Sequence, residues 1–229
     1  VVGSTTLAIG TTSKLNRTSG TAVLAMGNIT SEAGAILAIA QPSIATTTTT
    51  LVNDLLPGVL VGGALATRDG GNFVVPFTGF SDVTRLSSGT KVIANDATRN
   101  VRIIEGSGTL ADIVVAAAAT DANSLTNTST GGLATVRLDG NVLRLAAVGQ
   151  VVADTASQGL AITNGTLTAG GADGVAGGVI ISNNSVAATT INAAIADNGA
   201  GVVALAKLGA GGLTLAGANT YSGDTVIHE

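Results

Sequence analysis

Cysteine and tryptophan are absent from the 229 residues, and only four aromatic side chains are present: Phe73, Phe77, Phe80 and Tyr221. Without cysteine, the chain cannot be a disulfide-stapled scaffold. The scarcity of aromatic rings argues against an ordinary globular enzyme, because such cores are usually anchored on these rings. The single histidine, His228, lies one residue from the end. We expect it to be a frayed terminal residue rather than a catalytic base or a zinc ligand.

Charge is also scarce, since only 10% of the residues are charged and the formal net charge is −4. The ten basic residues are scattered between Lys14 and Lys207, so no basic face for nucleic acid is expected. The longest wholly apolar run, residues 113–119, is far shorter than the roughly 20 residues of a membrane-spanning helix. No signal-peptide pattern is visible, and we expect the chain to be a piece of a longer or processed protein.

The hydrophobic pattern repeats every two residues over short stretches, as in Leu160-Ala161-Ile162. Other short runs are apolar throughout, and asparagine and glycine punctuate the chain about every ten residues. This pattern predicts many short strands. Two alanine-rich stretches, 112–122 and 185–198, are expected to be strand or loop rather than helix.

The residue types available for the core decide between the all-β architectures. A sandwich or barrel needs bulky inward residues, whereas this chain offers mainly Ala, Val, Leu, Ile, Thr and Asn. Small and β-branched side chains suit a narrow stacked coil, in which asparagine and threonine hydrogen-bond along the axis. The composition therefore predicts a parallel β-helix, with about ten turns of roughly 20–25 residues spaced ~4.8 Å apart.

We expect one continuous β-helical segment over residues 1–229, with an irregular insertion or loop at residues 46–85. That region is less periodic and carries Pro57 and Pro76 together with Phe73 and Phe77. All three phenylalanines fall within it, so Phe73, Phe77 and Phe80 are a candidate contact patch.

The stretch 205–227 contains a Lys-x-Gly-x-Gly start, a Leu-Thr-Leu strand, a Gly-Ala-Asn-Thr-Tyr-Ser-Gly turn and a closing Thr-Val. It resembles the passenger-associated transport repeat of bacterial autotransporters. Residues 55–74 are similar to a segment of very large bacterial surface repeat proteins. The resemblance implies a right-handed parallel β-helix exported to the cell surface. The positions that carry the repeat motif are Lys207, Gly209, Gly211, Leu213, Leu215, Gly217, Asn219, Tyr221 and Gly223.

The residues of this motif also have a physical reading of their own. Leu213 and Leu215 should face the core with Thr214 facing out, or the reverse. The glycines allow a tight corner, and Asn219 is expected to cap a turn with its side chain. Tyr221 is expected to cover a corner with its hydroxyl in water.

Catalysis by paired carboxylates is the strongest enzymatic alternative. The best cluster is Asp96, Arg99, Arg102 and Glu105, which reads more simply as a solvated face with weak ion pairs. The glycine-rich loop around Asp173 suggests a calcium-binding repeat, but it occurs only once, which favours a plain loop. We therefore expect no enzyme, no metal and no cofactor.

Three functions remain open. The first is a structural segment of an exported bacterial surface or secreted protein, such as a stalk, fibre or filament. The second is an adhesin whose Phe-bearing loop binds a surface ligand, and the third, less favoured, is a carbohydrate-active enzyme. Neither end of the sequence resembles a polar cap, so we expect end-to-end stacking on adjacent repeats or further copies. The expected location is extracellular or on the bacterial cell surface, without nucleic acid and without a membrane-spanning segment.

Overall fold

The computed structural model describes residues 6–9, 13–32, 34–88 and 91–228. These residues form strands, turns and bends but no helix, and the strands build a parallel β-solenoid of about nine turns. The all-β solenoid prediction is therefore confirmed, and the two alanine-rich stretches contain strands as expected. Among the described residues there is no helix that could cross a bilayer.

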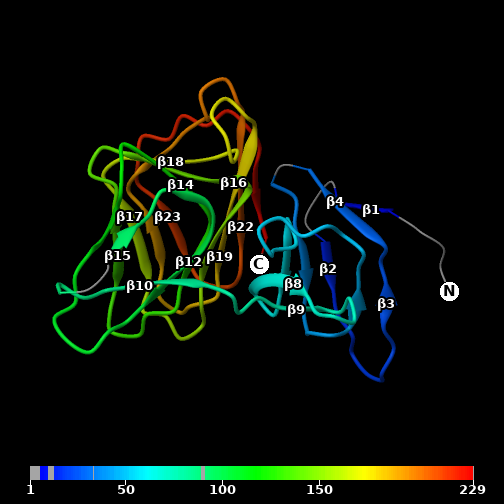
Figure 1. The fold of residues 1–229 in the computed structure, drawn as a ribbon. Coiled ribbons are helices and arrows are strands. Elements are labelled where there is room, and N and C mark those ends of the chain that lie inside the picture. The colour runs from blue at the N-terminus through cyan, green and yellow to red at the C-terminus, as the bar shows by residue number, and fades with distance from the viewer. Residues whose placement is uncertain (1–5, 10–12, 33, 89–90, 229) are drawn as a thin grey trace. The chain divides into compact units, whose positions relative to one another are not determined.

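The chain divides into two compact units, Val1–Gly79 and Phe80–Glu229, and each is described by itself (Figure 1). That the two form one continuous coil stays a prediction.

Parallel pairs of short strands make up most of the first unit. These strands are β1 (Thr6–Ile9), β2 (Ser13–Leu15), β3 (Leu24–Ala25), β4 (Asn28–Ser31), β5 (Leu37–Ile39), β6 (Ala45–Thr46) and β7 (Val59–Val61). The ladders are β1–β4, β2–β5–β7 and β3–β6. Leu37, Ile39, Val59 and Val61 point into the core and are almost fully buried.

Residues 46–85, which were predicted to be irregular, begin with a strand of the parallel ladder and continue with antiparallel strands. β7 continues the parallel ladder, but β8 (Ala64–Arg68) and β9 (Val74–Pro76) follow it as antiparallel strands. Gly62 and Gly63 lie between β7 and β8 with φ of 57° and 82°, which a tight reversal needs. Pro76 is at the end of β9, where a missing backbone N–H costs little.

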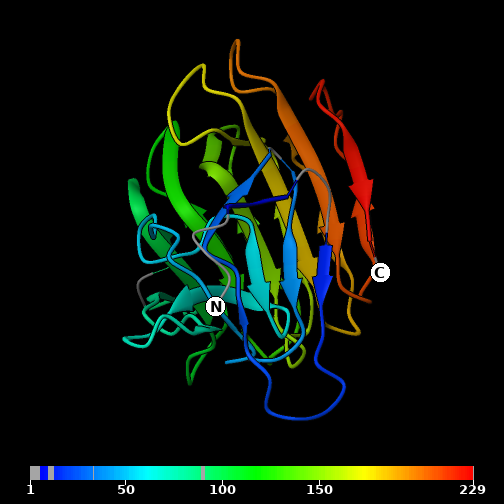
Figure 2. The ribbon, with the colours of Figure 1, turned by 90° about the vertical axis from the view of Figure 1, so that its right-hand side faces the viewer.

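Three sheet faces wind around one core in the second unit. Face 1 consists of β11 (Val92–Ile93), β13 (Ile113–Val115), β15 (Ala134–Arg137), β17 (Leu160–Thr163), β20 (Thr189–Ile191) and β23 (Leu213–Leu215). Face 2 consists of the first parts of β14 (Ala119–Asn127) and β16 (Val142–Ala153), with β18 (Thr166–Ala169) and β21 (Ala194–Ile195). Face 3 consists of β10 (Ser81–Thr84), β12 (Asp96–Ile104), the later parts of β14 and β16, and β19 (Gly177–Asn183), β22 (Val203–Leu208) and β24 (Thr225–Ile227). In Figure 2, β19, β22 and β24 lie side by side in yellow, orange and red.

The long strands turn a corner of the coil. Ala122 of β14 pairs with Leu145 of β16, but Ser124 pairs with Gln150, so the register shifts where face 2 meets face 3. Paired residues in neighbouring turns are 20 to 30 positions apart, as Thr84–Ile104 and Val148–Gly178 show. The turns therefore average close to the predicted 20–25 residues, and the longest exceed that range because loops at the corners vary in length.

Like side chains stack along the core. Val136, Ile162 and Ile191 are successive partners in face 1, and none of them is exposed to solvent. Burying each such side chain contributes about 1.5–3 kcal/mol, so small aliphatic columns stabilise the coil without aromatic anchors.

Candidate functional site

The repeat recognised in the sequence forms the last turn of the second unit. β22 pairs with β19 and β24, and β23 pairs with β20, all in parallel. Leu213 and Leu215 are half-buried against the core, while Thr214 between them is exposed. The alternation of core-facing and solvent-facing side chains is the one expected for this strand.

The glycines of the motif lie directly against the backbone of the preceding turn. A Cβ atom on Gly211 would lie 2.2 Å from the carbonyl oxygen of Ser185. One on Gly217 would lie 2.1 Å from the carbonyl oxygen of Ala193. These contacts leave no room for a side chain, so the glycines serve turn-to-turn packing. The same close approach occurs at Gly209 and Gly223.

Asn219 joins the repeat to the turn before it. Its side-chain oxygen accepts a hydrogen bond of 2.8 Å from the backbone N–H of Ile195, the last residue of β21. The backbone N–H of Thr220 donates to the carbonyl of the same Ile195 at 2.8 Å. The side chain of Asn219 therefore takes the place of a ladder partner for face 2.

The carboxylate of Asp197 accepts hydrogen bonds from the same last turn, a few residues after Asn219. Its carboxylate accepts from the backbone N–H and the hydroxyl of Ser222 at 3.0 and 2.7 Å, and from the N–H of Val203 at 2.8 Å. The hydrogen bonds from Ser222, followed by that from Val203, lower the pKa of Asp197 below its ordinary value. Tyr221 is half-buried against the core, and its hydroxyl lies 2.8 Å from the hydroxyl of Thr225 rather than being bound only by water.

Lys207 places a cation on the inward side of the last turn. Its position continues an inward column that holds Val151 and Ile181 in earlier turns, and the residue is only 7% exposed. The ammonium group donates to the carbonyls of Leu208 and Gly209 at 2.7 and 2.5 Å. These hydrogen bonds satisfy the buried charge at the corner.

A cavity of about 300 Å³ lies at the end of this turn. Its lining includes Leu205, Lys207, Leu213, Leu215 and Ile227. Ile227 is the register partner of Lys207 and yet is 72% exposed. The cavity lies at the last turn that the structure describes.

Sequence reasoning missed a second set of residues, which closes the corner between face 3 and face 1. The side-chain amide of Asn127 donates to the carbonyl of Gly159 at 2.9 Å, and that of Asn183 donates to Gly212 at 2.8 Å. In the first turn of the second unit, the guanidinium of Arg85 donates a hydrogen bond to the carbonyl of Leu133. Each acceptor immediately precedes a face 1 strand. That strand lies one turn ahead for the two asparagines and two turns ahead for Arg85.

A repeated local motif marks these corners. Each asparagine also accepts from the backbone N–H of the serine two residues later, Ser129 or Ser185. The available signal was therefore an Asn-x-Ser triplet that occurs twice, 127–129 and 183–185. Arg85 is buried, and this desolvation lowers its pKa, with opposing contributions from Glu105 and Asp112.

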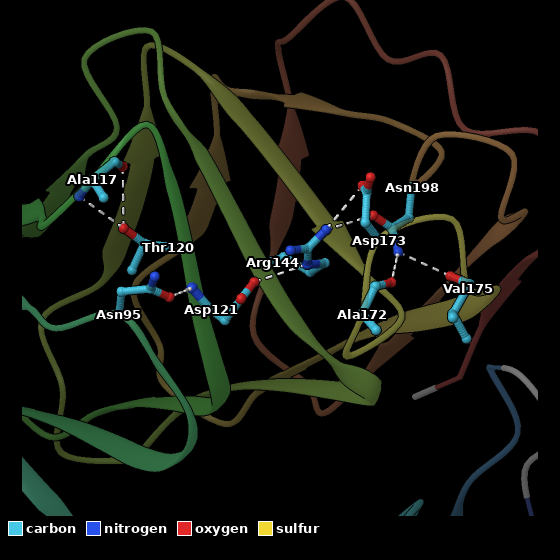
Figure 3. Close-up of polar contacts among 9 residues, drawn as sticks. All are labelled: Asn95, Ala117, Thr120, Asp121, Arg144, Ala172, Asp173, Val175 and Asn198. Atoms are coloured by element: carbon cyan, nitrogen blue, oxygen red, sulfur yellow. Dashed lines mark hydrogen bonds and ion pairs between the residues drawn. The ribbon is translucent and has the colours of Figure 1, made fainter.

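Arg144 connects three turns on one side of the coil (Figure 3). Its guanidinium donates to Asp121 in the preceding turn at 2.8 Å and to Asp173 in the following loop at 3.0 Å. It also donates to the side-chain oxygen of Asn198 at 3.3 Å, one turn further. Asn198 in turn donates to the carbonyl oxygens of Ala172 and Val175 at 2.6 and 3.0 Å. The glycine-rich loop is thus held by Arg144 and Asn198.

The predicted carboxylate cluster does not gather into one site. Arg102 donates to Asp82 of the preceding turn at 2.7 and 2.9 Å and lies over the ring of Phe80 at 5.0 Å. Its hydrogen bond lowers the pKa of Asp82. Asp96 pairs separately with Arg99 at 3.4 Å, with both side chains exposed.

Glu105 accepts from the backbone and hydroxyl of Thr130 instead of meeting Arg102. Within the described residues, no group of three His, Cys, Asp or Glu side chains could hold a metal ion. His228 is half-buried, and its backbone N–H donates to the carbonyl of Lys207 at 2.8 Å.

The three phenylalanines differ in burial. Phe77 is buried, and Phe73 and Phe80 are half-buried. Phe73 and Phe77 belong to the first unit and Phe80 to the second. The contact patch stays a prediction.

The passenger-associated-transport-repeat family model matches residues 205–229. Comparison with curated proteins and with solved structures found no match. The match covers the turn built by β22, β23 and β24, and it indicates an exported or surface protein. The last turn of this β-solenoid is therefore a passenger-associated transport repeat, consistent with the autotransporter passenger repeat family.

Proposed function

We propose that this chain is a structural segment of an exported bacterial surface protein, serving as part of a stalk, fibre or filament. The observation that carries the proposal is that the transport repeat is an integral turn of the coil. Its strands continue the ladders of faces 1 and 3, and its glycines pack on the preceding backbone. A segment built in this way transmits the coil onward rather than presenting a separate module.

The use of polar side chains supports a structural role without catalysis. Asn127, Asn183 and Asn219 bond to the backbone of neighbouring turns. Arg144 joins carboxylates of two other turns. Carboxylate, amide and guanidinium side chains, which act as catalytic groups in many enzymes, here form hydrogen bonds and ion pairs between turns.

Surface display tests this function. The chain is placed between a secretion signal and an outer-membrane translocator in a Gram-negative bacterium, and whole cells are treated with protease. We expect a surface-exposed, protease-resistant product, because the coil's backbone is hydrogen-bonded throughout its ladders. Gly217→Val should reduce the resistant product, since a side chain there meets the carbonyl of Ala193.

Gly212→Ala is the matched control, because a Cβ on Gly212 has nothing closer than 3.8 Å. Retention of the unmodified chain inside the cell, or complete digestion at the surface, would contradict the proposal.

A further inference from the structure

The dipeptide Asn-Gly occurs twice in the chain, at Asn164-Gly165 and at Asn198-Gly199. This dipeptide is especially prone to deamidation, because glycine has no side chain to hinder attack of its backbone nitrogen on the asparagine side chain. Both steps lie at corners of the second unit, the first between β17 and β18 and the second between β21 and β22. In the described part of the chain, neither glycine uses its backbone N–H in a hydrogen bond. The two steps therefore differ mainly in how the asparagine side chain is held.

The side chain of Asn198 is fixed by its neighbours and is only 3% exposed. Its amide nitrogen donates to the carbonyl oxygens of Ala172 and Val175 at 2.6 and 3.0 Å, and its oxygen accepts from Arg144 at 3.3 Å (Figure 3). Attack by the nitrogen of Gly199 would require this amide to turn away from all of these partners. The folded coil therefore protects Asn198.

The side chain of Asn164 is held by nothing comparable. It is exposed, and within the described residues it forms no hydrogen bond. The backbone alone is engaged, since the carbonyl of Asn164 accepts from the N–H of Gly140 at 2.6 Å. The amide carbon can therefore rotate toward the nitrogen of Gly165 without breaking a side-chain hydrogen bond.

The corner itself requires a dipeptide of this kind. Asn164 has a φ of 58°, a left-handed value that asparagine, aspartate and glycine adopt more readily than other residues. A Cβ atom on Gly165 would lie 2.4 Å from the carbonyl oxygen of Asn141 in the preceding turn, so glycine is needed there. The geometry of the turn thus favours the reactive pair, while it gives the amide of Asn164 no partner.

We infer that Asn164 is a site of spontaneous deamidation in the folded chain and that Asn198 is not. The backbone nitrogen of Gly165 forms a bond to Cγ of Asn164, the bond from Cγ to Nδ2 breaks, and the proton of the attacking nitrogen leaves with Nδ2 as ammonia. Water then adds to one carbonyl of the cyclic imide and breaks the adjoining C–N bond, which yields aspartate or isoaspartate. Either product adds a negative charge, and isoaspartate also inserts a carbon atom into a backbone that packs directly on Asn141.

Both asparagines can be followed in the same molecule. The purified full chain is kept in mildly alkaline buffer, either folded or in denaturant, and tandem mass spectrometry measures deamidation at each position over time. In the folded chain we expect Asn198 to react at least about tenfold more slowly than Asn164, because its side-chain hydrogen bonds must open first. In denaturant the two rates should become similar, because those hydrogen bonds are gone.

Asn164→Asp is the matched variant, since aspartate tolerates the same φ but has no amide to lose. In the folded variant, the fast release of ammonia should disappear while the rate at Asn198 stays unchanged. Equal rates at the two positions of the folded chain, a faster reaction at Asn198, or fast ammonia release that persists in Asn164→Asp would overturn the inference. A folded chain in which both positions stay intact, while the denatured chain reacts at both, would overturn it as well.

Discussion

At the scale of single residues, two adjacent glycines of the repeat have opposite surroundings. Gly211 lies against the backbone of Ser185, whereas a side chain on Gly212 would enter open space near Ala188. Both glycines lie at the corner between β22 and β23, and only Gly211 meets the backbone of the preceding turn.

We predict that Gly211→Ala destabilises the chain by about 1–3 kcal/mol, because the added methyl group forces two turns apart. Gly212→Ala should change the free energy of unfolding by no more than about 0.5 kcal/mol. Urea unfolding followed by circular dichroism measures both variants. Equal effects at the two positions would show that close packing on Ser185 is not what selects glycine.

The sequence predicted that these glycines matter but not why. We expected a tight corner, yet among the four motif glycines only Gly209 has a positive φ, of 78°. The carbonyls that exclude side chains come from residues 20 to 26 positions earlier, as the pairings Leu205–Thr225 and Ile181–Lys207 show. Which carbonyl lies under which glycine depends on the register between turns, and a single sequence does not display that register.

At the scale of elements, Asp197 and Asn219 attach the last turn to its predecessor where regular strand pairing ends. Asn219 supplies a partner for Ile195, and Asp197 accepts from Ser222. Tyr221 lies between these contacts and is the only tyrosine of a chain without tryptophan. Its fluorescence therefore reports on this turn alone.

We predict that the last turn loosens in acid. Hydrogen bonds lower the pKa of Asp197 below its ordinary 3.8, so their stabilisation is complete above that value. It is lost as the pH falls through the lower pKa of the folded state. Tyrosine fluorescence during acid titration should show a transition below pH 3.8 that is reduced in Asp197→Asn. Superimposable curves for the two proteins would rule out this role of Asp197.

Arg144 also attaches one turn to others, by hydrogen bonds to Asp121 and Asp173 along the side of the coil. Its side chain is 13% exposed, and we expect Arg144→Met to cost about 1–3 kcal/mol, because it removes charge-assisted hydrogen bonds to two carboxylates. Amide hydrogen exchange in residues 170–176 should accelerate.

Arg137→Met is the comparison for this variant, since Arg137 also pairs with two carboxylates but is largely exposed, and it should cost less than about 1 kcal/mol. Unchanged exchange in the loop of Arg144→Met would show that Asn198 suffices to hold it.

At the scale of the whole molecule, composition and alternation were enough to predict a parallel coil. The pattern Leu160-Ala161-Ile162 became β17, and the scarcity of aromatic rings matched a core of stacked aliphatic side chains. The antiparallel β8 and β9 were not anticipated, because residues 46–85 lack a clear period. The pairing of Arg144 with Asp173 was hidden as well, since those residues are far apart in sequence and meet only through the coil.

We predict slow refolding. The parallel ladders join residues 20 to 30 positions apart, so every turn must close before its pairing stabilises it. Dilution from denaturant, followed by far-UV circular dichroism, should give a main phase of about a second or longer. Complete refolding within milliseconds would contradict assembly turn by turn.

The corner asparagines have a consequence for how the protein is made. Asn127-Thr128-Ser129 and Asn183-Asn184-Ser185 are both acceptor sequences for N-linked glycosylation. The nitrogen that would carry the sugar is the one that donates to Gly159 or Gly212 inside the coil. A glycan added in a eukaryotic secretory pathway would prevent these two hydrogen bonds from forming at the corners. Correct folding therefore requires a host that does not glycosylate these asparagines.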